Sequence, residues 1–211
     1  MTRYAYDPTA IGEAPELHEW IRRELDKLRA DYLTPARTWE DLGVSLTTAK
    51  PGATRQPGYE KFKDNGAGST GVYAWHFDGS AVEELFFERQ LPHAFAELQG
   101  ELRPHVHWAP KSTSAGTVRW GLEYTGVSPL GVFGNTTIIY GEDVAEDAST
   151  HQIAVLPAID AATLAISSVL ICRLFRDATH GNDTYSPDAV ATSFDFHIEL
   201  DGRGSEQEYV K

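Results

Sequence analysis

Two histidines, His105 and His107, are the residues of this sequence whose type and spacing best suit chemistry. They flank Val106, and alternate residues of a β-strand face opposite sides of a sheet. A strand over this segment places both imidazoles on one face with Arg103, while Val106 and Trp108 face the other way. Imidazole nitrogens bind transition metals, and they also serve as polar groups that titrate near neutral pH. The pattern predicts either a metal site or a strand with a polar outer face.

A His-x-His pair on a strand resembles the cupin arrangement, in which a carboxylate and a third histidine complete a metal site. Glu123 lies farther beyond His107 than the cupin pattern places its glutamate, and the later Gly-Pro-Gly-His signature is absent. Further histidines are scattered along the chain: His93, His151 and His197. Zinc sites use three or four protein ligands, so one pair is not a site. We therefore predict no metal, cofactor or catalytic residue, with a cupin-like metal-dependent enzyme that uses His105 and His107 as an alternative.

No nucleophile with an adjacent base is evident. A Gly-x-Ser-x-Gly elbow is absent, and the single cysteine, Cys172, lies in a hydrophobic run that predicts a core position. Asp195, His197 and Glu199 alternate along a predicted strand, so they share a face that we interpret as solvated or part of an interface. These features favour a protein that is not an enzyme.

A helix is predicted from Pro15 to about residue 33, because proline suits the first helical turn and Thr34-Pro35 stops the helix. Apolar residues follow it at spacings of four, three and four: Ile21, Leu25, Leu28 and Tyr32. This spacing is typical of a coiled-coil seam. Two interpretations stay open, because the helix can join copies of the chain or pack on its own domain. In the first, these four residues form an interface between copies of the chain, with His105 and His107 at the symmetry axis; the resemblance described below implies that this interface is a trimer interface.

Residues 34–70 contain three prolines and five glycines, which predicts an extended connector. Within it, residues 66–71 match a dinucleotide-binding fingerprint. That fingerprint needs a strand before it and a helix after it, and neither is predicted here, so we interpret the segment as a loop. Residues 1–70 are therefore expected to form an N-terminal arm.

From residue 71 onwards, apolar and polar residues alternate, which is the two-residue period of β-strands. The candidate strands are 71–77, 83–90, 103–109, 117–125, 135–141, 151–156, 168–176 and 193–200. Clusters of glycine, proline, serine and aspartate separate them, as is typical of sandwiches and barrels. We predict an all-β fold, an eight-stranded jelly-roll-like sandwich over residues 71–211, preceded by the N-terminal helix and extended arm.

The composition excludes several partners. Among 211 residues, 31 are acidic and 18 basic, which gives a formal net charge of −13 and argues against binding nucleic acid or an anionic membrane. One cysteine excludes an intrachain disulfide framework. The sequence has no apolar signal segment and no stretch of membrane-spanning length, so we expect synthesis in the cytoplasm.

Several motifs follow one another along residues 71–211. They are residues 85–87, 90–93, 102–108, 118–124, 137–141, 172–177, 183–185, 195–199 and 208–211. Their order and spacing resemble a family of tailed-bacteriophage virion proteins. Residues 16–25 are also similar to the helix near the N-terminus of many phage fibre and spike proteins.

The resemblance implies a non-enzymatic, homotrimeric virion protein, made in the host cytoplasm. As a capsid decoration (cement) or head-fibre protein, it is expected to attach through its N-terminal arm to the major capsid protein or another virion protein. The alternative is a trimeric tail-fibre or receptor-binding protein whose β domain contacts a host surface glycan. The short chain favours decoration, since fibres usually carry longer shafts. The resemblance assigns no functional residue.

Overall fold

The computed structural model describes residues 15–28, 38–97, 100–201, 204–205 and 207–208. The chain divides into two compact units, Met1–Arg37 and Thr38–Lys211. The first contains helix α1 (Pro15–Leu28), which begins where the sequence predicted. The last part of the predicted helix, residues 29–33, lies outside the described residues. No helix among the described residues is long and apolar enough to cross a membrane.

The larger of two sheets, sheet A, has seven strands. They are β1 (Thr38–Val44), β3 (Gly58–Lys63), β4 (Val72–Phe77), β6 (Glu101–Pro110), β9 (Gln152–Val155), β10 (Ile159–Asp160) and β12 (Ala189–Leu200). The main path runs β10-β6-β12-β4-β3, while β1 also pairs with β12 and β9 with β6. All these pairings are antiparallel, and β12 alone joins β1, β4 and β6.

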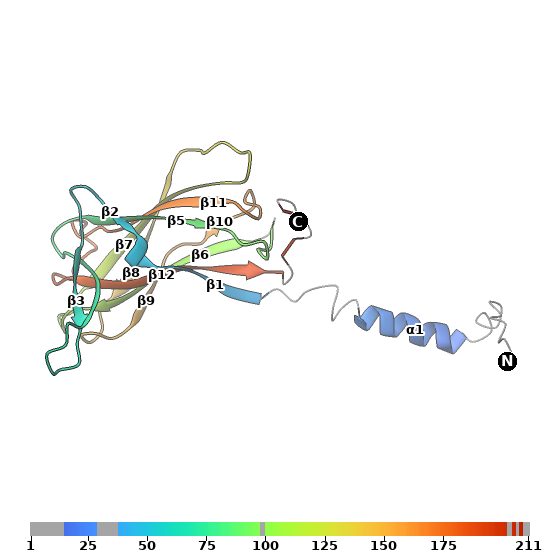
Figure 1. Ribbon diagram of the computed structural model, residues 1–211, viewed down its shortest axis with the longest axis horizontal. Helices are drawn as coiled ribbons and strands as arrows, with labels where there is room; N and C mark the ends of the chain where they lie inside the picture. The colour runs from blue at the N-terminus through green and yellow to red at the C-terminus, as the bar shows by residue number, and fades with distance from the viewer. Residues whose placement is uncertain (1–14, 29–37, 98–99, 202–203, 206, 209–211) are drawn as a thin grey trace. The chain divides into compact units, whose positions relative to one another are not determined.

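Sheet B has five antiparallel strands in the order β2-β5-β11-β7-β8. Their bounds are β2 (Lys50–Pro51), β5 (Glu83–Gln90), β7 (Thr117–Val127), β8 (Thr137–Val144) and β11 (Val169–Arg176). The two sheets pack as a curled sandwich (Figure 1). The predicted all-β sandwich is confirmed, and each of the eight predicted strands is present, as β4 to β9, β11 and β12.

The boundary predicted at residue 70 is wrong. Strands β1, β2 and β3 lie within the predicted connector, yet all three belong to the sheets of the β domain. Leu42 and Val44 of β1 are buried in the core. Leu46 follows them, and its carbonyl accepts a hydrogen bond of 2.7 Å from the indole of Trp75. Pro51 fits this arrangement because it ends a two-residue strand at the edge of sheet B, where proline is tolerated.

Alternation of apolar and polar residues builds the core. On β7, Val118, Trp120 and Leu122 are fully buried between the sheets, as their period of two predicted. Trp120 meets the ring of Phe77 edge to face, with centroids 5.1 Å apart, which joins the two sheets. Cys172 is buried in the same core, and burial raises the pKa of its thiol to about 12. The predicted core position of Cys172 is confirmed.

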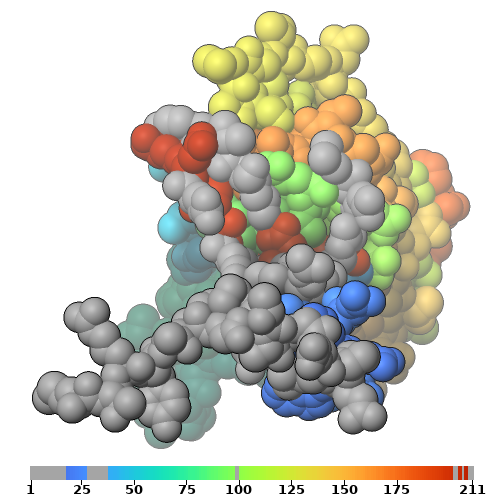
Figure 2. All heavy atoms as spheres, turned by 90° about the vertical axis from the view of Figure 1, so that its right-hand side faces the viewer, coloured from blue at the N-terminus to red at the C-terminus, as the bar shows by residue number. Residues whose placement is uncertain are grey.

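A projecting loop joins β7 to β8 over residues 128–136. It stands at the top of both views of the molecule (Figures 1 and 2). Leu130 is fully exposed and has a φ of 67°, and Val132 is 92% exposed. Such a group of apolar side chains at a loop tip suggests contact with another molecule.

One charged pair is enclosed by the β domain. Arg176 ends β11, and two of its nitrogens donate to both carboxylate oxygens of Asp183 at 2.9 and 2.8 Å; the side chains are 0% and 1% exposed. The guanidinium also donates to the carbonyls of Phe77 and Pro187, at 3.1 and 2.8 Å, and to that of Tyr185. The pair therefore holds the segment before β12 against the end of β4.

Replacing Asp183 with asparagine removes the negative charge but keeps the shape of the side chain. We expect the free energy of unfolding to fall by about 3–5 kcal/mol, because the Arg176 guanidinium stays buried without a counter-ion. Urea denaturation followed by tryptophan fluorescence measures the loss. As a control, Lys61→Met breaks the surface pair Lys61–Asp64 (2.7 Å) and is expected to leave the midpoint nearly unchanged. Equal shifts in the two variants would contradict a special role for the buried pair.

Candidate functional site

The strand register gathers histidines and carboxylates on the outer face of sheet A. Across β6 and β12, His105 lies directly opposite Asp195. Across β12 and β1, His197 lies directly opposite Asp41. His107 shares the face of His105, since both contact Asp195 at 3.0 and 3.6 Å. The predicted shared face of the two histidines is confirmed. We call this group, which His151 completes, the histidine cluster: Asp41, His105, His107, His151, Asp195 and His197.

One half of the cluster is a hydrogen-bonded chain. The Nε2 of His107 lies 3.0 Å from Oδ2 of Asp195, and its Nδ1 lies 2.8 Å from Nε2 of His151. A carboxylate only accepts, so Nε2 of His107 is the donor. In neutral His107, Nδ1 must then accept the N–H of His151. The rings of the two histidines stack with an interplanar angle of 13°. This series of hydrogen bonds, from His151 through His107 to Asp195, holds the carboxylate of Asp195 in one orientation.

The other half of the cluster leaves two facing atoms unsatisfied. His105 is 7% and Asp195 6% exposed. Nδ1 of His105 and Oδ1 of Asp195 are 3.6 Å apart, and neither has a hydrogen-bond partner among the described residues. Burial lowers the pKa of His105, and the neighbouring His197 lowers it further, whereas Asp195 opposes both. The rings of His105 and His197 lie 4.2 Å apart, and His197 reaches Asp41 at 2.9 Å.

The other predicted interface residues lie on α1. Ile21 and Leu25 are 38% and 54% exposed. The side chain of Leu28 and the whole of Tyr32 lie outside the described residues. The trimer interface itself stays a prediction. His93 is separate from the histidine cluster, since its ring nitrogens lie 2.8 and 3.0 Å from the hydroxyls of Ser205 and Ser167.

Sequence reasoning named His105 and His107 but missed Asp195 as their shared partner, and it missed Asp41. The alternation of Asp195 and His197 on one strand was visible. The pairing of β6 with β12 was not, because it joins residues about ninety positions apart in the sequence. Asp41 was missed because the sequence predicts a connector over residues 34–70, where the structure has strand β1.

A second group of titratable residues surrounds His76, which is 5% exposed. Its Nδ1 lies 4.0 Å from carboxylate oxygens of both Glu60 and Asp188, and neither ring nitrogen has a hydrogen-bond partner among the described residues. The ammonium of Lys111 lies 2.5 Å from Asp188 and 3.6 Å from Glu60. Lys111 thus already forms an ion pair with each of the two carboxylates, which a cation bound there would have to displace.

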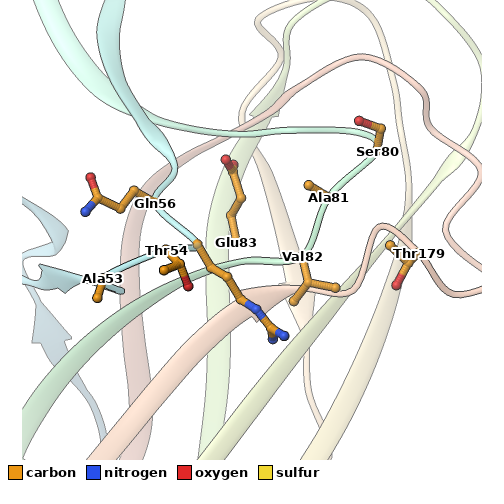
Figure 3. A pocket seen from close by; sticks show the side chains of 9 residues that line it. Ala53, Thr54, Gln56, Ser80, Ala81, Val82, Glu83 and Thr179 are labelled. Atoms are coloured by element: carbon orange, nitrogen blue, oxygen red, sulfur yellow. The ribbon is translucent and has the colours of Figure 1, made fainter.

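A pocket of about 770 Å³ lies elsewhere on the β domain, with Glu83 among the side chains that line it (Figure 3). It is lined by Ala53, Thr54, Arg55, Gln56, Ser80, Ala81, Val82, Glu83 and Thr179. The Glu83 carboxylate accepts the backbone N–H of Asp78 at 2.7 Å, and burial raises the pKa of Glu83. The lining residues include no histidine or cysteine.

The His76 group predicts a pH dependence of stability. Burial lowers the pKa of His76, and Lys111 lowers it further against the pull of Glu60 and Asp188. The unfolded chain keeps a pKa near 6.5, so below this pH the unfolded state binds a proton that the folded state does not. The contribution of His76 to the free energy of unfolding is therefore fully present above about pH 6.5, and it is lost as the pH falls towards the lowered pKa of the folded state.

We expect His76→Gln to lose less stability than the parent chain between about pH 7.5 and about pH 5. Urea midpoints across this range measure the difference. Part of the dependence remains in the variant, because the lowered pKa of His105 acts with the same sign. Identical pH profiles for parent and variant would show that His76 does not titrate as the geometry implies.

No protein-family model matches the sequence, and a search of curated proteins finds no match. Among solved structures, the chain is similar to the CBM35 from Cellvibrio japonicus Abf62. The identity is 11%, the match covers 76% of this chain and 92% of the other, and the TM-score is 0.35. It is also similar to TmCBM61, solved in complex with β-1,4-galactotriose, with 17% identity, coverages of 76% and 88%, and a TM-score of 0.33. Likeness at this level assigns no ligand and no function to the present chain.

Proposed function

We propose that this chain is a non-enzymatic structural protein of a tailed-bacteriophage particle, a homotrimer that decorates the capsid and attaches through its N-terminal segment. Three features support the proposal. The sequence motifs along the β domain resemble those of phage virion proteins, the β domain is a sandwich, and both units of the chain expose apolar side chains of the kind that assembly covers.

The exposed apolar stripe of α1 carries the proposal. Trp20, Ile21 and Leu25 are 52%, 38% and 54% exposed, although large apolar side chains on an amphipathic helix normally pack against another surface. Ile21 and Leu25 occupy neighbouring seam positions of the heptad pattern. The polar side of the helix is solvated, with a pair between Lys27 and Glu24 at 2.8 Å. Three copies of α1 packed along this stripe would remove it from water.

The β7–β8 loop supplies a second contact surface in this proposal. Leu130, Val132 and Phe133 are 106%, 92% and 47% exposed. Their position on a projecting loop suits insertion into an apolar depression of a neighbouring virion protein. The β domain would thereby bind the particle at a point separate from the N-terminal segment.

Charge on the helix stripe is expected to abolish trimer formation. We predict that Ile21→Lys combined with Leu25→Lys converts the trimer to monomers, because two buried cations per helix cannot be solvated in a seam. Light scattering of the purified chain measures the mass. The matched control, Arg23→Glu with Asp26→Lys, changes two charges on the polar side of the helix, away from the apolar stripe, and is expected to remain trimeric.

The proposal would be contradicted by a parent chain that is monomeric in solution and also does not bind to capsids. Cryo-electron microscopy of intact particles then tests the location. Trimers on the capsid surface support decoration, and trimers at the tail tip support the receptor-binding alternative. Absence of the chain from the particle excludes both.

Glycan binding is a second candidate function, and an exposed aromatic group on β3 and β4 favours it. Tyr59 and Tyr73 are 49% and 43% exposed, and their rings lie 5.8 Å apart. The ring of Trp75 lies 4.8 Å from that of Tyr59. Aromatic faces of this kind offer apolar contact area to sugar rings, with the tyrosine hydroxyls as polar contacts. As a receptor-binding protein, the chain would hold a host surface glycan here.

Replacing Tyr59 and Tyr73 together with alanine is expected to abolish glycan binding, because the exposed part of the aromatic surface is removed. A glycan array probed with the labelled full chain measures the binding. Trp39→Ala is the control, since Trp39 is an exposed aromatic residue (46%) on β1 that packs against Arg103 instead. If the parent chain binds no glycan, or if Trp39→Ala alone abolishes binding, the aromatic group on β3 and β4 is not the site.

A further inference from the structure

The two facing atoms of the histidine cluster need a partner. Nδ1 of His105 and Oδ1 of Asp195 belong to side chains that are 9% and 8% exposed, and neither has a hydrogen-bond partner among the described residues. A buried polar atom without a partner destabilises the folded state, because it has lost its hydrogen bonds to water. At 3.6 Å, the two atoms are too far apart to satisfy each other. A group placed between them would satisfy both.

We propose that His105, Asp195 and His197 bind a divalent transition-metal ion of the zinc class. One ligand atom from each residue lies within 4.8 Å of the other two. Ligand atoms around tetrahedral zinc are about 3.4 Å apart, given bonds of about 2.0–2.2 Å. The 3.6 Å separation of His105 and Asp195 is already close to this distance. His197 needs a small inward movement, which its 39% exposed side chain allows.

Neighbouring side chains already orient the ligands. His107 donates from Nε2 to Oδ2 of Asp195 at 3.0 Å, which leaves Oδ1 directed at His105. Asp41 lies 2.9 Å from Nε2 of His197. A proton on that nitrogen leaves the lone pair of the other for a metal. Carboxylates and histidines that hold metal ligands in this way commonly strengthen metal binding.

The donor set selects the class of ion. Two imidazole nitrogens and one carboxylate oxygen suit zinc and related transition metals, whereas magnesium and calcium prefer oxygen ligands throughout. The fourth position is left for water or another donor, because His197 borders solvent. Glu60, His76 and Asp188 form a comparable group, but Lys111 lies 2.5 Å from Asp188 and competes with a cation there.

This inference goes beyond the virion role and does not depend on the oligomeric state. It also differs from the cupin-like alternative, because Asp195 and His197 join His105 as ligands while His107 supports Asp195. The site spans the pairing of β6 with β12, so a bound ion would fasten two central strands of sheet A.

The test is a titration of the full-length chain with Zn²⁺ after removal of metal by a chelator. Calorimetry is expected to give one ion per chain, and the visible absorption of added Co²⁺ is expected to indicate tetrahedral coordination. His197→Gln removes the most exposed ligand, so this variant should keep its fold. It is expected to weaken Zn²⁺ binding by at least about tenfold, since loss of a ligand costs more than loss of a supporting residue.

His93→Gln is the matched control, because it removes a histidine that lies outside the histidine cluster and contacts the hydroxyls of Ser205 and Ser167 instead. It is expected to keep one bound ion per chain with affinity within a few-fold of the parent. Circular dichroism checks that both variants are folded. Absence of Zn²⁺ binding by the parent chain, or equal affinities of parent and His197→Gln, would overturn the assignment. Loss of binding in His93→Gln alone would do the same.

Discussion

The antiparallel register of β6 against β12 is the constraint on which the core and the histidine cluster both depend. It places His105 opposite Asp195 on the outer face, while Val106 and Phe194 pair on the inner face. A slip of one residue would exchange the two faces of the moved strand. The imidazoles would then enter the apolar core, and Trp108 would enter water. The burial of Val106, Trp108 and Phe194 therefore fixes the geometry of the polar groups behind them.

Local periodicity predicted much of the β domain. Apolar and polar residues alternate along most of β7 and along the second part of β12, so both strands were found, although β12 begins at Ala189, four residues before its predicted start. Strands β1 to β3 were missed because their sequences are short, interrupted by glycine and proline, and only partly buried. Strand β1 shows the reason. Only Leu42 and Val44 at its end enter the core, and its place in sheet A comes from pairing with β12.

The candidate site could be predicted only in part. The shared face of His105 and His107 follows from strand geometry alone. The identity of their partner does not, because Asp195 reaches them only through a pairing between distant segments. Lys111 and Glu60 around His76 are separated along the chain in the same way. Sequence patterns predict which face of its strand a side chain occupies, while the order of the strands in the sheet decides which side chains lie next to one another.

The position of β12 in the chain also governs the order in which the protein can fold during synthesis. Sheet B is complete once residue 176 has left the ribosome, because β2, β5, β7, β8 and β11 all precede that point. In sheet A, by contrast, β1, β4 and β6 must wait for residues 189–200 before they gain their shared neighbour. Until then, their edges and apolar faces stay open to other chains. A nascent chain therefore passes through an aggregation-prone interval in which sheet B is formed, while sheet A is still divided into β1, the β3–β4 pair and the group of β6, β9 and β10.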